Sequence, residues 1–202
     1  MRVLLACEES QEVCKRFREK GHEAYSCDIQ ACSGAFPEYH IKGDVLEVLK
    51  DGWDLMVAFP PCTHLAVSGA AWFEEKRKDG RQQAGIDFFM AMINAPIPKI
   101  AVENPIGIMS SVYRKADQII HPYYFGDSYS KSTCLWLKGL PKLKHYKQTD
   151  LFNTKTWVDR GEFVTYASGK RMPKWYAELS GNGKERSKTF PGIAQAMADQ
   201  WG

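Results

Sequence analysis

Continuous apolar runs alternate with amphipathic stretches along most of the chain. The runs stop abruptly at polar or proline residues, as buried strands do. They predict strands at Arg2–Ala6, His22–Asp28, Trp53–Phe59, Pro98–Pro105 and Ser132–Leu140, and a short strand with a helical turn in HIKGDVLEVL. Apolar residues at helical spacing predict helices at Gln11–Lys20, Arg81–Asn94 and Gly192–Trp201. This alternation predicts an α/β fold with a Rossmann-like, mostly parallel sheet.

The regular pattern breaks between residues 141 and 183 into short aromatic and charged pieces. We expect this segment to be a small irregular appendage of loops and short strands. The main domain then comprises residues 1–140 and 184–202. The length of 202 residues suits one core with such an appendage.

The composition is ordinary for a globular chain, with 44% hydrophobic and 25% charged residues. No apolar run approaches membrane-spanning length, and the first is too short for a signal peptide, so we expect a cytoplasmic protein without membrane contact. The six cysteines include no CxxC pair, which favours reduced thiols. Cys27 and Cys32, with His22 or His40, match no standard zinc spacing, and no metal site is expected.

The formal net charge of +3 permits contact with nucleic acid without arguing for it. Between Lys131 and Lys188, however, lysines and arginines are mixed with aromatic residues, which suits phosphate contact and base stacking. The candidates for such a surface are Trp157, Lys170, Arg171, Lys174, Trp175 and Tyr176. An irregular, solvated surface is the alternative interpretation.

Five predicted strands end on polar or reactive residues. These residues are Cys7-Glu8-Glu9-Ser10, Asp28, Asp44, Pro60-Pro61-Cys62 and Glu103-Asn104. Each alone is also explained as a cap or turn residue. Because ligands of open parallel sheets bind beyond the carboxyl ends of the strands, their joint placement predicts a binding site at one edge of the sheet.

The residues at the ends of the first three predicted strands favour a nucleotide-like cofactor without a pyrophosphate. Asp28 follows the first turn by about twenty residues, where an acid commonly binds ribose hydroxyls. The first turn lacks a GxGxxG pattern. S-adenosylmethionine has a ribose, an adenine and an amino-acid tail but no phosphate, and it fits this combination. Asp44 is placed to accept from the adenine amino group, or else to cap the following helical turn.

The ends of the two later strands offer a thiol, Cys62, and a carboxyl group, Glu103. Cys62 follows two prolines that restrict its backbone, and as a thiolate it is a nucleophile. Glu103, one strand over, is expected to face the same pocket. A buried, protonated glutamate can donate to a ring nitrogen while accepting from an exocyclic amine. A buried thiol in a strand-end turn is the alternative for Cys62.

These residues resemble a known family. The stretch AFPPCTHLAVSG resembles the catalytic loop of DNA (cytosine-5)-methyltransferases, and AVENP resembles their Glu-Asn motif. KSTCLWLKGLP resembles the strand that carries a basic residue toward the target base. ERSKTFPGIAQAMADQW is similar to the C-terminal cofactor-side motif and helix. The pattern as a whole resembles the short methylase-like proteins of phages and prophages.

The resemblance implies roles for individual residues. It implies a catalytic group of Cys62, Glu103, Asn104 and Lys131. It implies contacts to S-adenosylmethionine by Ala6, Cys7, Glu8, Ser10, Asp28, Ile29, Asp44, Val45, Pro60, Ser187 and Thr189. It implies contacts to DNA by Ser68, Lys131, Thr133, Lys170, Arg171 and Lys174.

The implied reaction is attack of Cys62 on C6 of a flipped-out cytosine, with Glu103 at N3 and the 4-amino group and methylation at C5. Three departures stand out. The glycine-rich first motif is replaced by ACEESQEV, the usual paired arginines by Lys131 and Thr133, and a full target-recognition domain by residues 141–183. We therefore expect relaxed specificity, or specificity supplied by a protein partner, in a monomer or dimer.

Two alternatives stay open. The same ring chemistry can serve RNA or a free nucleotide, as the missing recognition domain suggests. A non-catalytic module that binds nucleic acid or protein is the other alternative, although the presence of both Cys62 and Glu103 argues against it.

Overall fold

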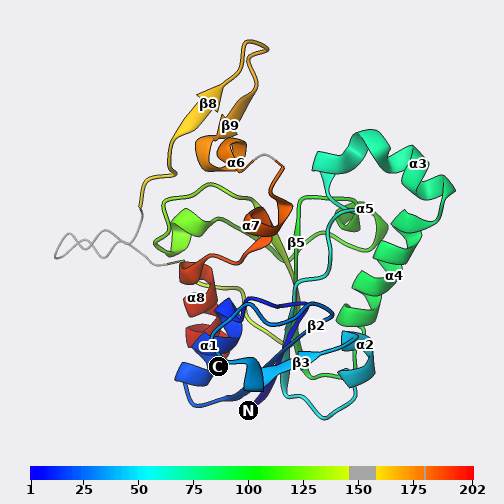
Figure 1. Ribbon diagram of the computed structural model, residues 1–202, viewed down its shortest axis with the longest axis vertical. Coiled ribbons are helices and arrows are strands. Elements are labelled where there is room, and N and C mark those ends of the chain that lie inside the picture. Colours follow the sequence, from blue (N-terminus) through cyan, green and yellow to red (C-terminus); the bar gives the residue numbers. More distant parts are fainter. Residues whose placement is uncertain (146–157, 180) are drawn as a thin grey trace.

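The computed structural model describes residues 1–145, 158–179 and 181–202. A seven-stranded sheet forms its centre, helices pack on both faces, and a two-stranded hairpin projects from one end (Figure 1). The first strand lies inside the sheet, and the last helix packs on one of its faces. Both termini therefore lie beside the main core.

The central sheet is parallel over most of its width. Its strands in spatial order are β3 (His40–Lys42), β2 (Glu23–Asp28), β1 (Arg2–Ala6), β4 (Leu55–Ala58), β5 (Lys99–Pro105), β7 (Thr133–Lys138) and β6 (Gln118–Ile120). The strands from β3 to β5 run parallel, whereas β7 is antiparallel to both β5 and β6. The strand order reverses between β1 and β4, and open parallel sheets commonly bind ligands beyond the carboxyl ends of the strands at such a point. The expected Rossmann-like α/β fold is confirmed.

Two apolar layers hold helices against the sheet. The helices are α1 (Glu12–Glu19), α2 (Val45–Val48), α3 (Phe73–Lys78), α4 (Arg81–Ile93), α5 (Met109–Val112), α6 (Lys174–Glu178), α7 (Gly183–Ser187) and α8 (Pro191–Trp201), with 3₁₀ turns η1 (Pro37–Tyr39), η2 (Val67–Trp72) and η3 (Pro122–Phe125). Phe17 of α1 and Trp201 of α8 pack on one face, and Phe89 and Met92 of α4 pack on the other. Because β1, β4 and β5 are covered on both sides, their sequences are continuously apolar.

The structure contains elements that the apolar pattern did not predict. Helix α3 has the sequence FEEKRK, whose charges leave no apolar stripe, and β6 is a three-residue edge strand. The predicted strands and helices are present, and most end one or two residues inside the expected limits. Cap and edge residues cause these differences, because they share the composition of the elements without sharing their hydrogen bonds.

The segment expected as an appendage begins inside the core. Leu143 is buried against the face that carries α1 and α8, and the Lys144 backbone N–H donates to Gln200 Oε1 at 2.7 Å. Farther on, β8 (Phe163–Thr165) and β9 (Arg171–Pro173) form the projecting hairpin, which α6 follows (Figure 1). Trp157, a candidate for nucleic-acid contact, lies outside the described residues.

The next two findings concern membrane-spanning helices and clusters of metal-binding side chains. Within residues 1–145, 158–179 and 181–202, no helix is long and apolar enough to cross a membrane. Nor do three or more histidine, cysteine, aspartate or glutamate side chains of these ranges gather as a metal ion would require.

Candidate active site

The loop that carries Cys62 is a tight turn beyond the end of β4. Pro60 is buried and Pro61 exposed, and the Cys62 carbonyl accepts hydrogen bonds from the N–H groups of Leu65 and Ala66, both at 3.0 Å. Leu65 is fully buried and anchors the turn in the core. The prolines and this anchor hold the partly buried Cys62 at the edge of the sheet.

Glu103 lies on the neighbouring strand and faces the same end of the sheet. Ala58, the last residue of β4, pairs with Val102, so Glu103 is one residue beyond this pair. Across the antiparallel pair β5–β7, the buried Thr133 is a diagonal neighbour of Glu103, and its hydroxyl donates a hydrogen bond to the carboxyl group. Burial raises the pKa of Glu103, and Lys131 and Thr133 partly offset that rise. The environment therefore favours the protonated carboxylic acid.

The charges around Cys62 act in opposite directions. Burial raises the pKa of the thiol, and the negative charge of Glu103 raises it further. The positive charges of Lys131 and Arg186 lower it. A protonated Glu103 removes one of the two opposing effects, so the acid form of Glu103 and the thiolate form of Cys62 support each other.

Asn104 connects the two halves of this site. Its side chain is buried, and its Nδ2 donates to the Pro60 carbonyl at 2.9 Å and to the Glu103 carbonyl at 3.2 Å. The amide thus ties the end of β5 to the loop that carries Cys62. The structure therefore gives Asn104 a positioning contact between these two segments.

A second set of contacts, which the sequence did not suggest, fixes the far side of the Cys62 loop. The Lys76 side chain is buried, and its Nζ donates to the Thr63 carbonyl at 2.8 Å. The loop after β5 pairs with the same stretch, because Ile108 N–H donates to the Leu65 carbonyl at 2.9 Å. At Gly107, a Cβ atom would lie 2.3 Å from the Leu65 carbonyl oxygen, so the close approach requires glycine.

Arg186 is the second functional candidate that sequence reasoning missed. It lies in α7, and its carbonyl accepts a hydrogen bond from Lys131 Nζ at 3.2 Å. Its guanidinium carbon lies 4.6 Å from the centre of the Tyr176 ring. The one available signal was its membership of the basic and aromatic stretch, which does not distinguish it from its neighbours.

The first turn reproduces a glycine-like backbone without glycine. Cys7 and Gln11 have φ angles of 59° and 58°, and the N–H groups of Cys7 and Glu8 both donate to the Cys27 carbonyl. The left-handed conformation is uncommon for side chains of this size. The turn therefore keeps the tight path between β1 and α1 that glycines commonly allow.

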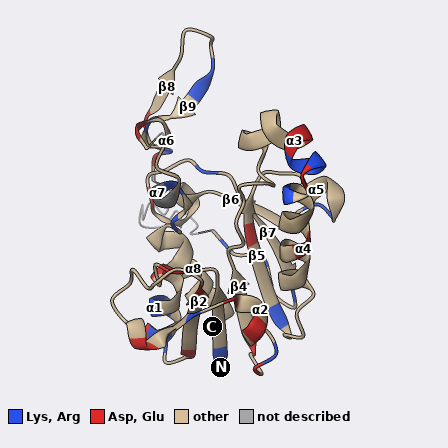
Figure 2. Ribbon diagram, turned by 45° about the vertical axis from the view of Figure 1, so that its right-hand side comes forward, with Lys and Arg blue, Asp and Glu red and all other residues tan. Residues whose placement is uncertain are grey.

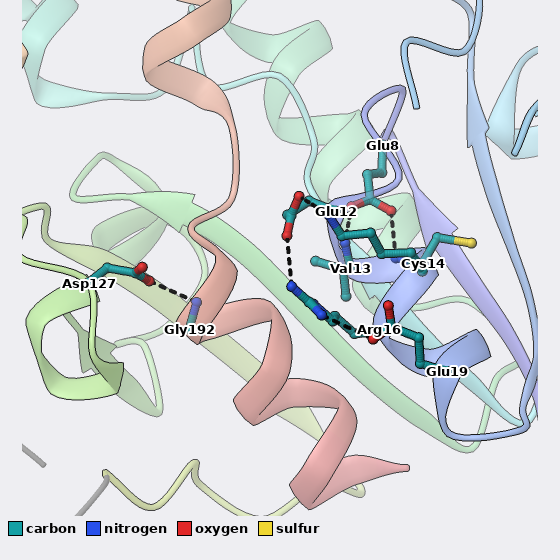
Figure 3. A network of polar contacts seen from close by, with 9 residues as sticks. Glu8, Glu12, Val13, Cys14, Arg16, Glu19, Asp127 and Gly192 are labelled. Atoms are coloured by element: carbon teal, nitrogen blue, oxygen red, sulfur yellow. Dashed lines mark hydrogen bonds and ion pairs between the residues drawn. The ribbon is translucent and has the colours of Figure 1, made fainter. Parts of the chain in front are cut away.

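The Glu8 carboxylate is engaged by the helix that follows it. Its Oε1 accepts from Val13 N–H at 2.6 Å and its Oε2 from Cys14 N–H at 3.1 Å (Figure 3). Burial nevertheless raises the pKa of Glu8 to about 7, against the effect of these two bonds. Glu8 thus accepts from two N–H groups at the start of α1 that have no partner within the helix. N–H groups at this position commonly bind a ligand's anionic group, such as a carboxylate.

The acidic candidates gather beside this turn. Ala6 pairs with Cys27 and Asp28 with Lys42, so Cys7, Asp28 and Asp44 lie at the same edge of the sheet. Burial raises the pKa of the Cys7 thiol to about 12, and the charges of Asp28 and Asp44 add to the rise. Asp44 Oδ1 accepts from Leu46 N–H at 3.0 Å as the N-cap of α2. Asp28 Oδ1 accepts from Gln30 N–H at 2.8 Å. Both carboxylates therefore have local structural partners.

The remaining candidates for cofactor contact are placed at varied depths. Ile29 exposes 75% of its surface directly after Asp28, an unusual amount for an isoleucine. Ala6, Val45 and Pro60 are buried, so they can offer backbone or packing surface alone. Ser10 is partly buried, Ser187 ends α7, and Thr189 precedes α8.

The candidates for DNA contact do not form one group. Ser68 is exposed in η2, whereas Lys170 and Arg171 are exposed on the projecting hairpin (Figure 2). Lys174 pairs with Glu162 at 2.6 Å. Trp175 packs against aromatic rings at the base of the hairpin, which gives it a structural role. Thr133 and Lys131 lie beside Glu103 instead.

Comparisons with solved structures show a likeness in fold. No protein-family model matches the chain, and no curated protein matches it. The fold is similar to a crystal structure described as a "putative DNA modification methyltransferase" encoded within a prophage of E. coli, with a TM-score of 0.52 and 16% sequence identity. The match covers 82% of this chain and 58% of the other, so the chain spans less than two thirds of that structure's length. At this identity the likeness supports the fold.

Proposed function

We propose that the protein is a DNA methyltransferase that transfers a methyl group from S-adenosylmethionine to C5 of cytosine. The observation that carries the proposal is the placement of Cys62 and Glu103 on adjacent strand ends, with Lys131 acting on both. The prophage structure with a similar fold, described as acting in DNA modification, agrees with this reaction class.

The reaction follows from the two groups. The Cys62 thiolate adds to C6 of the cytosine, and the electron pair moves through the ring toward N3. Protonated Glu103 donates its proton to N3 and accepts a hydrogen bond from the 4-amino group, so C5 becomes enamine-like. Methyl transfer to C5 would leave S-adenosylhomocysteine. Loss of the C5 proton to a base such as water then forms the C5–C6 double bond and expels the Cys62 thiolate, and N3 returns its proton to Glu103. A base inside a duplex must first leave the stack, which costs a few kcal/mol.

The residues at the first turn fit the adenosine part of S-adenosylmethionine. Asp28 and Asp44 offer carboxylate oxygens, and the exposed Ile29 offers an apolar surface for a purine ring. When bound, this cofactor supplies an electrophilic methyl group. Because Glu8 already occupies the amides of α1, we assign the amino-acid tail to the backbone of Ala6 and Cys7 and to Ser10.

The decisive experiment measures transfer of labelled methyl from S-adenosylmethionine to a cytosine-rich duplex. We expect transfer by the wild type and none by Cys62→Ala. An oligonucleotide with 5-fluorocytosine, which cannot lose a proton from C5, should become covalently attached to Cys62. Transfer to RNA or free nucleotides alone would redirect the proposal to those substrates, and absence of both transfer and cofactor binding would favour a non-catalytic module.

Relaxed specificity belongs to the same proposal. The hairpin and helices after residue 158 are small, and their exposed basic side chains contact phosphates without reading bases. We expect methylation of cytosines in many sequence contexts, or a partner protein that narrows the choice. Sequencing of methylated random duplexes, with and without host extract, measures this directly.

A further inference from the structure

The Arg186 side chain carries a hydrogen-bond donor that nothing in the described protein satisfies. Its Nε is shielded from solvent and has no hydrogen-bond partner among the described residues. Leaving a buried charged donor unpaired is costly, so such a group in a native fold calls for an explanation. The guanidinium lies over the Tyr176 ring at 4.6 Å, which limits its freedom without using its N–H groups.

The positive charge of Arg186 acts on the two reacting groups unequally. Lys131 acts electrostatically on both Cys62 and Glu103, whereas Arg186 acts on Cys62. The two cations are joined, because Lys131 Nζ donates to the Arg186 carbonyl. Arg186 is thus linked to Lys131 through its carbonyl, and its positive charge acts on the Cys62 thiol.

This asymmetry matches the two ends of a bound nucleotide. With C6 at Cys62 and N3 at Glu103, N1 is on the Cys62 side, because N1 is bonded to C6. N1 carries the sugar, and the sugar carries the phosphates. A planar guanidinium with donors in a fork suits a phosphate group better than a single base atom.

We propose that Arg186 binds a phosphate group attached to the sugar of the target nucleotide, so that Nε and a terminal N–H pair with its oxygens. This inference rests on the proposed function, since it uses the same orientation of the base. It also explains why the donor is unsatisfied in the protein alone: the substrate is its partner. Arg186 thereby fixes C6 over the thiol in addition to supporting the thiolate.

Binding of single-cytosine oligonucleotides tests the proposal. Each flanking phosphate, 5′ or 3′ of the cytosine, is replaced in turn by an uncharged methylphosphonate. We expect one of the two replacements to weaken binding to the wild type by about 10- to 100-fold. Arg186→Gln should weaken binding by a similar factor and should no longer respond to that replacement. If the variant responds as strongly as the wild type, Arg186 does not bind that phosphate and the proposal fails.

Two further variants separate the effect of the guanidinium shape from the effects of charge and of unfolding. Arg186→Lys retains the charge and the stem but loses the fork, so it should bind between the wild type and Arg186→Gln; it also serves if the glutamine variant does not fold. Arg160→Gln is the matched control, because Arg160 also lies over a tyrosine ring, that of Tyr123, at 5.3 Å. We expect Arg160→Gln to keep the full response to the methylphosphonate.

Competition by deoxycytidine and its 5′-monophosphate distinguishes a terminal phosphate from a backbone phosphate. A preference for the monophosphate that disappears in Arg186→Gln supports the contact with a free nucleotide. Absence of any Arg186-dependent preference, in this assay and with the oligonucleotides, overturns the inference. Since binding is measured without methyl transfer, an inactive protein that keeps the linkage dependence refutes the proposed function and leaves the phosphate contact standing.

Discussion

At the scale of single residues, the site is a balance between burial and charge. Burial raises the pKa of both Cys62 and Glu103, and Lys131 lowers both. In the proposed reaction the net rise helps at Glu103, because a protonated acid is needed at N3. The rise hinders at Cys62, because the proposed nucleophile is the thiolate.

Lys131→Gln should raise the pKa of Cys62 further. The variant loses a cation near the thiol, so the pH at which iodoacetamide alkylates Cys62 at half its maximal rate should move upward. Peptide mass spectrometry separates Cys62 from the other five cysteines. Lys142→Gln, at an exposed lysine, is the control and should leave the midpoint in place. A midpoint that does not move in Lys131→Gln would mean that the lysine charge does not reach the thiol.

Glu8 should make the stability of the protein fall as pH rises from about 4.5 to about 7. Its pKa in the folded protein is raised to about 7 from 4.5, so the folded state binds more protons than the unfolded state between these values. The stabilisation is complete below the lower value and is lost through the upper one, by about 3 kcal/mol at most.

Urea unfolding at pH 5 and pH 7.5 measures this dependence. Glu8→Gln lacks the titrating group, so its free energy of unfolding should change less between the two pH values than that of the wild type. The variant also loses one acceptor for the amides of α1, which lowers its stability at both pH values. Parallel curves for the two proteins would show that Glu8 is not the group responsible.

At the scale of elements, the Cys62 loop is held by contacts that sequence patterns do not reveal. The strands β1, β4 and β5 are predictable because burial on both faces makes them continuously apolar. The resemblance of the Pro-Pro-Cys and Glu-Asn stretches brought Cys62 and Glu103 into one hypothesis. Lys76 and Arg186 escaped prediction, because their roles depend on backbone carbonyls and rings that come together in the folded chain.

Gly107→Ala should disturb the Cys62 loop from the neighbouring strand end. The added Cβ would lie 2.3 Å from the Leu65 carbonyl oxygen, so one of the two loops must shift. We expect a destabilisation of about 1–3 kcal/mol. Under conditions in which the variant is still fully folded, we also expect a lower yield of 5-fluorocytosine adduct, because the thiol is no longer held in place. Thermal unfolding and adduct yield are the measurements.

Gly43→Ala is a matched control for this substitution. Gly43 also follows a strand, its backbone has no positive φ, and a Cβ there meets nothing within 4 Å. Its stability and adduct yield should stay close to those of the wild type. If Gly107→Ala behaves like Gly43→Ala, the contact between the two loops does not position Cys62.

At the scale of the whole molecule, the proposed DNA interface has two parts with different roles, the strand ends and the hairpin. The strand ends that carry Cys62 and Glu103 hold the proposed reacting groups, whereas the hairpin β8–β9 projects outward (Figures 1 and 2) and its Lys170 and Arg171 are exposed. Arg171 lies over the Phe163 ring at 4.4 Å, which holds it on the hairpin. Such an arrangement suits a phosphate contact at a distance from the target base.

The double variant Lys170→Gln and Arg171→Gln should weaken DNA binding similarly for all sequences. Removal of each phosphate-binding cation should reduce the slope of log affinity against log salt by about 1, so the slope should fall by about 1 to 2. Fluorescence anisotropy at several salt concentrations measures it. The control double variant Lys50→Gln and Lys142→Gln removes the same charge from other exposed positions. Equal slopes in both doubles would assign the effect to net charge alone.

The amide bridge of Asn104 has a consequence for how such a protein can evolve. Asn104, Pro60, Gly107 and Leu65 all lie within residues 58–108, and their contacts hold the Cys62 loop from a part of the chain that precedes the hairpin. The hairpin region can therefore be lengthened, shortened or exchanged while the nucleophile stays in place. Under the proposed function, a recombining lineage can then exchange the segment that contacts DNA while the Cys62 loop stays intact, provided that the new segment places a cation where Arg186 lies.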